Sequence, residues 1–379
     1  MSHNAHKLRH KARRALPAFA FDYVDGGADD ERALANNQSV FDRWQFAPQV
    51  LKEASQRQLE TRLGNQLLSA PLIIAPTGYN GMLRRDADLM LARAAAQTGI
   101  GYTQSTVSTA SIEEAAAAHG GQNHWFQLYV LKEQQVTLNL IERARKAGCS
   151  ALVVSVDAVH FGNRERDKQH YRRPMKLTLK ALVDVACHPG WIWRTLVPQG
   201  MPGFGNLKPY LPEDKQKGLA GAAYFAEQMD KTITWETIRW IRQQWQGPLY
   251  VKGIMRKEDA MMAKECGAEG IVLSNHGGRQ LDGTVSPMQV LSQVRAEVGR
   301  DLHIIIDSGF RRGTDIVKAL ALGADAVMVG RPLLYAVATE GEAGVKAAII
   351  TLKEEIDRTL AQLGYTSLTQ LTPASLCSY

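Results

Sequence analysis

The stretch that decides the fold is Ile271-Val-Leu-Ser-Asn-His-Gly-Gly-Arg-Gln-Leu-Asp282, an apolar run that breaks abruptly into polar and glycine residues. The run 271–273 is typical of a buried strand in a parallel sheet, because helices cover both faces of such a sheet. The break then places His276 and Arg279 three residues apart on a turn that two glycines loosen. Histidine can accept a proton near neutral pH, and the guanidinium of arginine binds carboxylates through paired hydrogen bonds. Together they indicate an acid substrate that loses a proton. A solvated turn with a chance histidine is the plainer interpretation.

Similar apolar runs recur along the chain, separated by segments with a helical pattern. Repeated strand–helix units require a parallel sheet covered by helices, and eight of them close into a TIM (β/α)8 barrel. An open doubly wound sheet is the alternative, but no Gly-x-Gly-x-x-Gly follows the first strand. We expect one domain over 1–379, with an N-terminal helical cap at 1–70 and an insertion at 176–211 after the fourth strand. The expected strands are 71–78, 101–106, 125–130, 151–158, 248–254, 271–273, 303–309 and 326–332.

Polar residues fall at or just after the carboxyl end of each expected strand. In a barrel those ends converge on one mouth, where this fold keeps its chemistry. Scattered surface residues would not keep that phase through eight units. The residues concerned are Thr77, Ser105, Gln127, Tyr129, Asp157, Lys252, His276, Asp307 and Arg331.

The overall composition is that of a globular protein with a moderately basic balance. The chain has 379 residues, of which 45% are hydrophobic, and a formal net charge of +7. A basic balance suits nucleic acid, an anionic membrane or small anions, and no recognition motif or basic stripe interleaved with aromatic residues favours nucleic acid. The four cysteines are far apart, which indicates neither a disulfide framework nor a metal site. The start of the chain has no secretion-signal pattern, and no run of eighteen apolar residues predicts a membrane span.

Two glycine-rich stretches near the C-terminus indicate a phosphate site. DSGFRRGTD (307–315) and VGRP (329–332) follow the seventh and eighth expected strands, where barrels often bind phosphate. Glycines let backbone amides approach an anion closely, and arginines supply charge. Plain glycine turns are the alternative. The residues expected at this site include Gly309, Arg311, Gly330 and Arg331.

Three other polar residues each allow two interpretations from the sequence. Lys252 lies inside an apolar strand, so it either meets an anion, such as a reduced flavin, or is a Schiff-base amine of a barrel aldolase. Asp157 either orients His276 or caps a helix. Tyr23, before the Gly26-Gly27 break, is most simply a packed aromatic residue.

Several motifs together resemble one family, that of the FMN-dependent L-2-hydroxyacid dehydrogenases and oxidases. They are FDYVDGGADDE, PTG, FQLYV, GNRERD, VKGI, SNHGGRQLD, DSGFRRGTD and GRPLLYA, and they cover nearly the whole chain except the insertion. The resemblance implies FMN as the cofactor, oxidation of an L-2-hydroxyacid to the 2-oxoacid, and a homotetramer. GNRERD and LKEEIDRTLAQLG are more similar to mandelate dehydrogenase than to glycolate oxidase, which favours an aromatic or bulky acid within a mandelate- or lactate-like substrate class. An oxidase that releases hydrogen peroxide is the alternative.

The resemblance also implies a role for each matching position. His276 would be the catalytic base, paired with Asp157, and Arg279 would hold the substrate carboxylate. Tyr23, Arg164 and Tyr129 would complete the substrate site. Lys252 would lie at the N1–O2 edge of the flavin. The other flavin contacts would be Thr77, Gly78, Ser105, Gln127 and Ser155, and the phosphate contacts Asp307, Gly309, Arg311, Gly330 and Arg331.

The insertion at 176–211 mixes tryptophans and aliphatic residues with lysines and arginines. This mixture suits the headgroup boundary of an anionic bilayer, although a lid or an oligomer contact has the same appearance. Membrane-associated bacterial members of the family carry a similar segment. We therefore expect peripheral attachment at the cytoplasmic side of the inner membrane, with a quinone as electron acceptor. A soluble cytoplasmic protein is the alternative.

Overall fold

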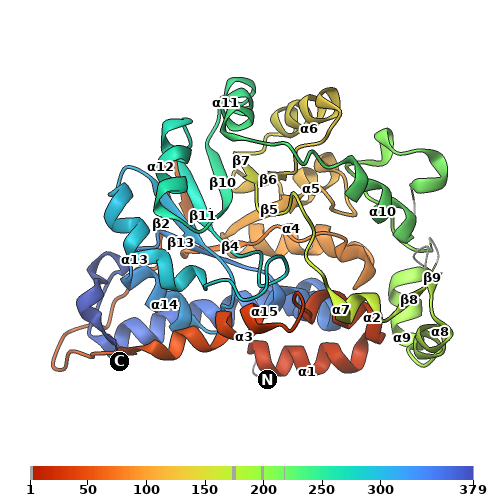
Figure 1. The fold of residues 1–379 in the computed structure, drawn as a ribbon. Coiled ribbons are helices and arrows are strands. Elements are labelled where there is room, and N and C mark those ends of the chain that lie inside the picture. The colour runs from red at the N-terminus through yellow and green to blue at the C-terminus, as the bar shows by residue number, and fades with distance from the viewer. Residues whose placement is uncertain (1–2, 173–175, 198–199, 217, 379) are drawn as a thin grey trace.

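Eight parallel strands close into a barrel in a computed structural model that describes all residues except 1–2, 173–175, 198–199, 217 and 379 (Figure 1). Around the barrel the strand order is β4, β5, β6, β7, β10, β11, β12 and β13, and β13 pairs with β4. This confirms the predicted TIM barrel. The strands are β4 (Leu72–Ile74), β5 (Gly101–Ser105), β6 (His124–Leu128), β7 (Ala151–Ser155), β10 (Leu249–Ile254), β11 (Gly270–Leu273), β12 (His303–Ile306) and β13 (Ala326–Val329).

Helices between the strands cover the outside of the barrel, which is why nearly every strand residue is buried. The long α15 bends at Gly341, whose φ of 65° is not helical. The helices are α4 (Ala87–Thr98), α5 (Ile112–His119), α6 (Gln134–Lys146), α11 (Trp235–Gln244), α12 (Lys257–Glu265), α13 (Pro287–Val298), α14 (Gly313–Ala321) and α15 (Arg331–Leu363).

The amino end of the barrel is closed by packed side chains. A hairpin of β2 (Thr61–Leu63) and β3 (Gln66–Leu68) contributes Leu63 and Leu68 to the interior cluster. Inside the barrel, Trp125 stacks on Tyr250 with ring centroids 4.8 Å apart, and Trp125 Nε1 donates to Gln66 Oε1 at 2.6 Å. A filled interior leaves the carboxyl end as the place for a site.

The N-terminal cap consists of α1 (Ala5–Ala15), α2 (Ala18–Asp25) and α3 (Arg32–Ser39), followed by η1 (Val40–Arg43) and β1 (Trp44–Phe46). Figure 1 shows α1 lying along α15. β1 pairs with β14 (Leu376–Ser378) near the other end of the chain, next to the turns η6 (Leu368–Gln370) and η7 (Pro373–Ser375). Asn37 and Asn275 exchange two hydrogen bonds of 2.8 Å, which fasten the cap to the loop after β11.

A long segment separates β7 from β10, and it extends beyond the predicted 176–211. It contains α7 (Glu165–Lys168), the hairpin β8 (Tyr171–Arg172) and β9 (Lys176–Leu177), α8 (Leu179–Ala186), α9 (Pro189–Trp191), the π-helix η3 (Ile192–Leu196), η4 (Lys208–Tyr210), η5 (Glu213–Lys215) and α10 (Gly218–Gln228). Trp191 anchors it, donating to the carbonyl of Met82 in η2 (Asn80–Met82) at 2.9 Å and packing edge-on against Phe19. Among the described helices, none has the length and apolar character needed to cross a membrane.

Candidate active site

A histidine and an aspartate from two loops meet at the carboxyl mouth of the barrel. His276 Nδ1 lies 3.1 Å from Asp157 Oδ1. The turn after β11 makes this possible, because His276, Gly277 and Gly278 all have positive φ and turn the imidazole back toward β7. Although burial opposes ionisation, the His276 ring and then Lys252 hold the pKa of Asp157 below its usual value. The carboxylate is therefore ionised and stabilises a protonated imidazole. The helix-cap interpretation of Asp157 was wrong.

Beside this pair, Lys252 projects from β10 into the mouth and is 4% exposed. Its ammonium lies 2.9 Å from Asp307 Oδ2 and donates to Ser274 Oγ at 2.8 Å. Burial lowers the pKa of Lys252, but the charges of Asp307 and Asp157 outweigh burial and raise it. A lysine held in the charged form is a poor nucleophile, which argues against the Schiff-base aldolase.

The mouth also holds a polar atom that lacks a partner. Gln127 Oε1 accepts hydrogen bonds from Ser105 Oγ at 3.0 Å and from the Thr106 amide at 3.3 Å, which fixes the orientation of the side chain. Gln127 Nε2 is buried and has no protein acceptor among the described residues. A buried donor without a partner is costly, so the site fits a ligand that carries an acceptor, such as a ring carbonyl of a flavin.

Gly78 lies where the loop after β4 packs closely against Val107. A Cβ at this position would lie 2.3 Å from Val107 Cγ2, so glycine alone lets this backbone lie so close to Val107. Asn80 Nδ2 holds the neighbouring Thr77 through its carbonyl and hydroxyl oxygens, both at 3.0 Å. Ser155 ends β7, in register with Lys252 on β10.

Two arginines flank one aromatic ring on the substrate side. The guanidinium carbons of Arg279 and Arg164 lie 5.3 Å and 5.7 Å from the Tyr23 ring centroid. Burial, reinforced by Arg164, lowers the pKa of Arg279. Two neighbouring cations in a desolvated site favour an anionic ligand, and a carboxylate matches the guanidinium fork. Tyr23 donates to the carbonyl of Gly78 at 3.1 Å, so it is more than a packed aromatic residue.

Tyr129 follows β6 and packs against Phe225 of α10, with ring centroids 6.0 Å apart. Burial is the main cause that raises the pKa of Tyr129, so its hydroxyl keeps its proton and can donate a hydrogen bond.

The two glycine-rich stretches lie as predicted around the start of α14 and α15, but the arginines differ from expectation in their contacts. Arg331 donates to the carbonyls of Val24 at 2.9 Å, Gly26 at 2.9 Å and Gly277 at 3.0 Å. Burial, reinforced by Arg279, lowers the pKa of Arg331 to about 10. Its guanidinium thus ties the cap to the barrel, and Arg311 donates to the Phe310 carbonyl at 2.9 Å.

Sequence reasoning missed several residues that hold this site together. Ser274 accepts from both Lys252 and the His276 amide, and Ser308 accepts from the Gly277 amide and donates to Asp307. Asp167 lies 3.5 Å from Arg164 and has a buried oxygen without a hydrogen-bond partner among the described residues. The hydroxyl residues had one signal, which was their place within two residues of the end of an apolar strand.

The side chains at the mouth are thus arranged to accept a proton at His276, to bind an anion beside Arg279 and to donate a hydrogen bond from Gln127. Residues 12–378 match the FMN-dependent dehydrogenase family, and the chain belongs to it. It is an FMN-dependent 2-hydroxyacid dehydrogenase of the mandelate- and lactate-dehydrogenase type.

Two curated relatives and two solved structures illustrate the similarity. The chain is 42% identical over 371 residues to (S)-mandelate dehydrogenase of Pseudomonas putida, covering 98% of this chain and 92% of the relative. It is 40% identical over 369 residues to L-lactate dehydrogenase of Pseudomonas putida strain F1, covering 97% and 96%. The crystal structure of the monotopic membrane protein (S)-mandelate dehydrogenase matches with a TM-score of 0.94 at 42% identity, covering 100% of both chains. A mandelate oxidase matches at 0.83 and 31%, covering 100% and 99%.

Proposed function

We propose that the protein oxidises an aromatic or similarly bulky L-2-hydroxyacid to the 2-oxoacid and passes the electrons to a membrane quinone. The observation that carries the chemistry is the contact between His276 and Asp157 at the mouth. The similarity to mandelate dehydrogenase and mandelate oxidase supports the bulky substrate. We further propose one domain over 1–379, a homotetramer, and a peripheral position at the cytoplasmic face of the inner membrane.

His276 is the proposed base. Because Asp157 accepts the hydrogen bond of Nδ1–H, Nε2 carries the lone pair that takes the hydroxyl proton of the substrate. Asp157 then stabilises the imidazolium. FMN, when bound, would accept the hydrogen of the α-carbon together with the two electrons of the oxidation, which leaves the 2-oxoacid.

Arg279 and Arg164 are proposed to hold the substrate carboxylate over Tyr23, and Tyr129 to donate to the substrate hydroxyl or carboxylate. These contacts fix the α-carbon in one orientation, which converts binding energy into rate. Gln127 and Lys252 are proposed to hold the pyrimidine edge of FMN, where Lys252 would stabilise negative charge. Thr77, Gly78, Ser105 and Ser155 would line the ring, and Asp307, Gly309, Arg311, Gly330 and the backbone of Arg331 the ribityl phosphate side.

The proposed membrane contact rests on the exposed face of the insertion. Leu179, Leu182 and Val183 on α8 are 68%, 51% and 58% exposed, and Trp193 is 73% exposed. Apolar side chains that project together from one segment favour an interface with lipid or protein. The resemblance to a monotopic membrane protein supports lipid.

The proposal is tested by replacing His276 with Gln. The variant is expected to bind FMN normally but to lose nearly all reduction of the flavin by substrate in anaerobic stopped-flow spectroscopy. Mandelate, lactate and glycolate, compared in the same experiment, rank the substrates. Bleaching of the variant at the wild-type rate would refute the role of His276.

The acceptor is tested separately. Reduced enzyme is mixed with oxygen or with a soluble quinone, and reoxidation is followed at the flavin absorbance. Faster reoxidation by quinone supports the dehydrogenase. Faster reoxidation by oxygen, with peroxide release, would establish the oxidase instead.

A further inference from the structure

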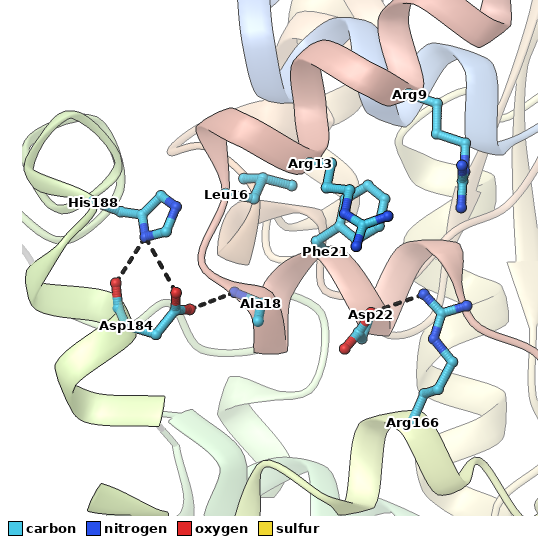
Figure 2. Close-up of a pocket in the computed structure, with 9 residues that line it drawn as sticks. All are labelled: Arg9, Arg13, Leu16, Ala18, Phe21, Asp22, Arg166, Asp184 and His188. Carbon is cyan, nitrogen blue, oxygen red and sulfur yellow. Dashed lines mark hydrogen bonds and ion pairs between the residues drawn. The ribbon is translucent and has the colours of Figure 1, made fainter. Parts of the chain in front are cut away.

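A cavity of about 420 Å³ lies outside the active site, between the N-terminal cap and the insertion. Figure 2 shows Arg9 and Arg13 projecting from α1 on one side, Arg166 from α7 on another, and Asp184 of α8 with His188, which directly precedes α9, on a third. Arg9 and Arg13 are four residues apart, so they share one face of α1. The cavity thus brings together three arginines from two helices, with an aspartate and a histidine on the third side.

The acidic groups in and around this cavity are already paired. Asp22 accepts from Arg166 at 2.8 Å and is 2.7 Å from His170 Nε2. Asp25, behind them, accepts two hydrogen bonds from Arg9. Asp184 accepts from the Ala18 amide at 2.6 Å. Asp22 and Asp25 are thus neutralised by arginines, Asp184 Oδ1 has His188 Nδ1 at 3.7 Å, and none of the three carboxylates is paired with the further cation of the cavity.

Arg13 is that further cation. Its side chain is exposed and lines the cavity, and among the described residues it has no hydrogen bond or ion pair. His188 faces the cavity from the opposite side, and its Nδ1 lies 2.7 Å from the carbonyl of Asp184, to which it donates. An anion that entered here would meet the guanidinium of Arg13 without displacing any existing ion pair.

We propose that this cavity binds a phosphate ester. The source closest to it is the headgroup of an anionic membrane lipid, because the exposed apolar residues of α8 lie on the same helix as Asp184. The apolar residues of α8 would then contact the lipid tails, while Arg13 binds the headgroup. Only the lipid source depends on the proposed membrane association; phosphate binding itself does not.

The test compares Arg13→Gln with Arg14→Gln in the FMN-loaded enzyme, whose cofactor phosphate site is filled. Arg14 is the adjacent residue on α1, is exposed, and does not line the cavity, so its variant loses the same charge. Titration calorimetry with glycerol 3-phosphate is expected to show saturable binding to wild type and Arg14→Gln. Arg13→Gln should bind about tenfold more weakly, the loss of one charged hydrogen bond. Equal affinities in both variants, or no binding to wild type, would overturn the proposal.

Vesicle sedimentation then identifies the source, using phosphatidylcholine with and without phosphatidylglycerol. If the lipid is the source, phosphatidylglycerol strengthens binding and Arg13→Gln loses several-fold more of this gain than Arg14→Gln. If the variants differ with glycerol phosphate but not with vesicles, the cavity binds a soluble phosphate ester. Leu182→Ser serves as the separate control for apolar insertion. Should wild type bind no vesicles at all, the proposed membrane association fails while the calorimetry still decides the cavity.

Discussion

The carboxylate of Asp184 in α8 caps α2 by accepting a hydrogen bond from the Ala18 amide at 2.6 Å. α2 begins after Pro17, and no side chain of its own supplies a cap. The first amides of a helix lack partners within the helix, so a carboxylate at this place stabilises it. Because α2 also carries Tyr23, the inserted segment stabilises the helix that supports the arginines of the active site.

Replacing Asp184 with Ala is expected to lower the free energy of unfolding by about 1 kcal/mol, the usual value of an N-cap. It should also raise KM for the hydroxyacid more than it lowers kcat, since Tyr23 loses part of its support. Urea unfolding and steady-state kinetics measure the two effects. Asp184→Asn keeps an acceptor and should remain closer to wild type. An Ala variant with unchanged stability and KM would show that the cap contributes nothing.

Replacing Lys252 with Met leaves the buried Asp307 without its cation. Breaking a buried pair by removing one partner costs about 3–5 kcal/mol, so the variant should unfold at much lower urea concentration and retain little FMN. The flavin-to-protein absorbance ratio measures the second effect.

The control is the double variant Lys252→Met, Asp307→Asn, which removes both charges and should recover part of the lost stability. A double variant that is no more stable than the single one would mean that the two charges are not coupled.

The burial of His124 predicts that the free energy of unfolding depends on pH. Burial, with a smaller contribution from His119, lowers the pKa of His124 to about 3 from the ordinary 6.5. As the pH falls, the unfolded chain therefore binds the proton at a higher pH than the folded chain does. The contribution of His124 to stability is complete above pH 6.5 and is lost as the pH falls toward 3. Each pH unit in that window costs about 1.4 kcal/mol. Urea midpoints between pH 7 and 5 should fall less steeply in His124→Gln than in wild type, and His10→Gln, at an exposed site, should behave as wild type.

Gly309 is expected to tolerate no side chain. Its φ is +97°, and a Cβ would lie 1.8 Å from the carbonyl oxygen of Asn37 in the cap. Gly309→Ala should therefore give little folded, FMN-containing protein. Gly148 has a similar φ of +77° with nothing within 4 Å of its Cβ, so Gly148→Ala should cost only about 1–2 kcal/mol of backbone strain. Similar thermal midpoints for the two variants would disprove the steric explanation.

Much of the fold was predictable because several barrel strands are short apolar runs with polar residues close to their carboxyl ends. The runs containing Ile271 and Ile304 mark strands without any knowledge of their neighbours, since burial on both faces leaves no alternation. The contact between His276 and Asp157 was predictable only because the carboxyl ends of barrel strands lie together at one mouth. The insertion at 176–211 stays a prediction, and α10 follows it before the chain reaches β10.

The side-chain contacts of the candidate site were less predictable. Arg331 lies in a motif that indicates a phosphate site, yet its guanidinium bonds three carbonyls that come from the cap and the loop after β11. No local pattern contains that information, because the partners are up to 307 residues away. The same holds for the Asp184 cap and for the partners of Gln127.

The sequence by itself determined the barrel, the family and the types of residue at the mouth, because apolar periodicity and strand-end residues are local properties of the chain. Only the tertiary structure decided which of those residues touch, which donor is left without a partner, and where Arg13 stands without a counter-ion. These depend on distances between segments far apart in the chain, and the free energy of a charge or a hydrogen bond is set by such distances and by the exclusion of water around them.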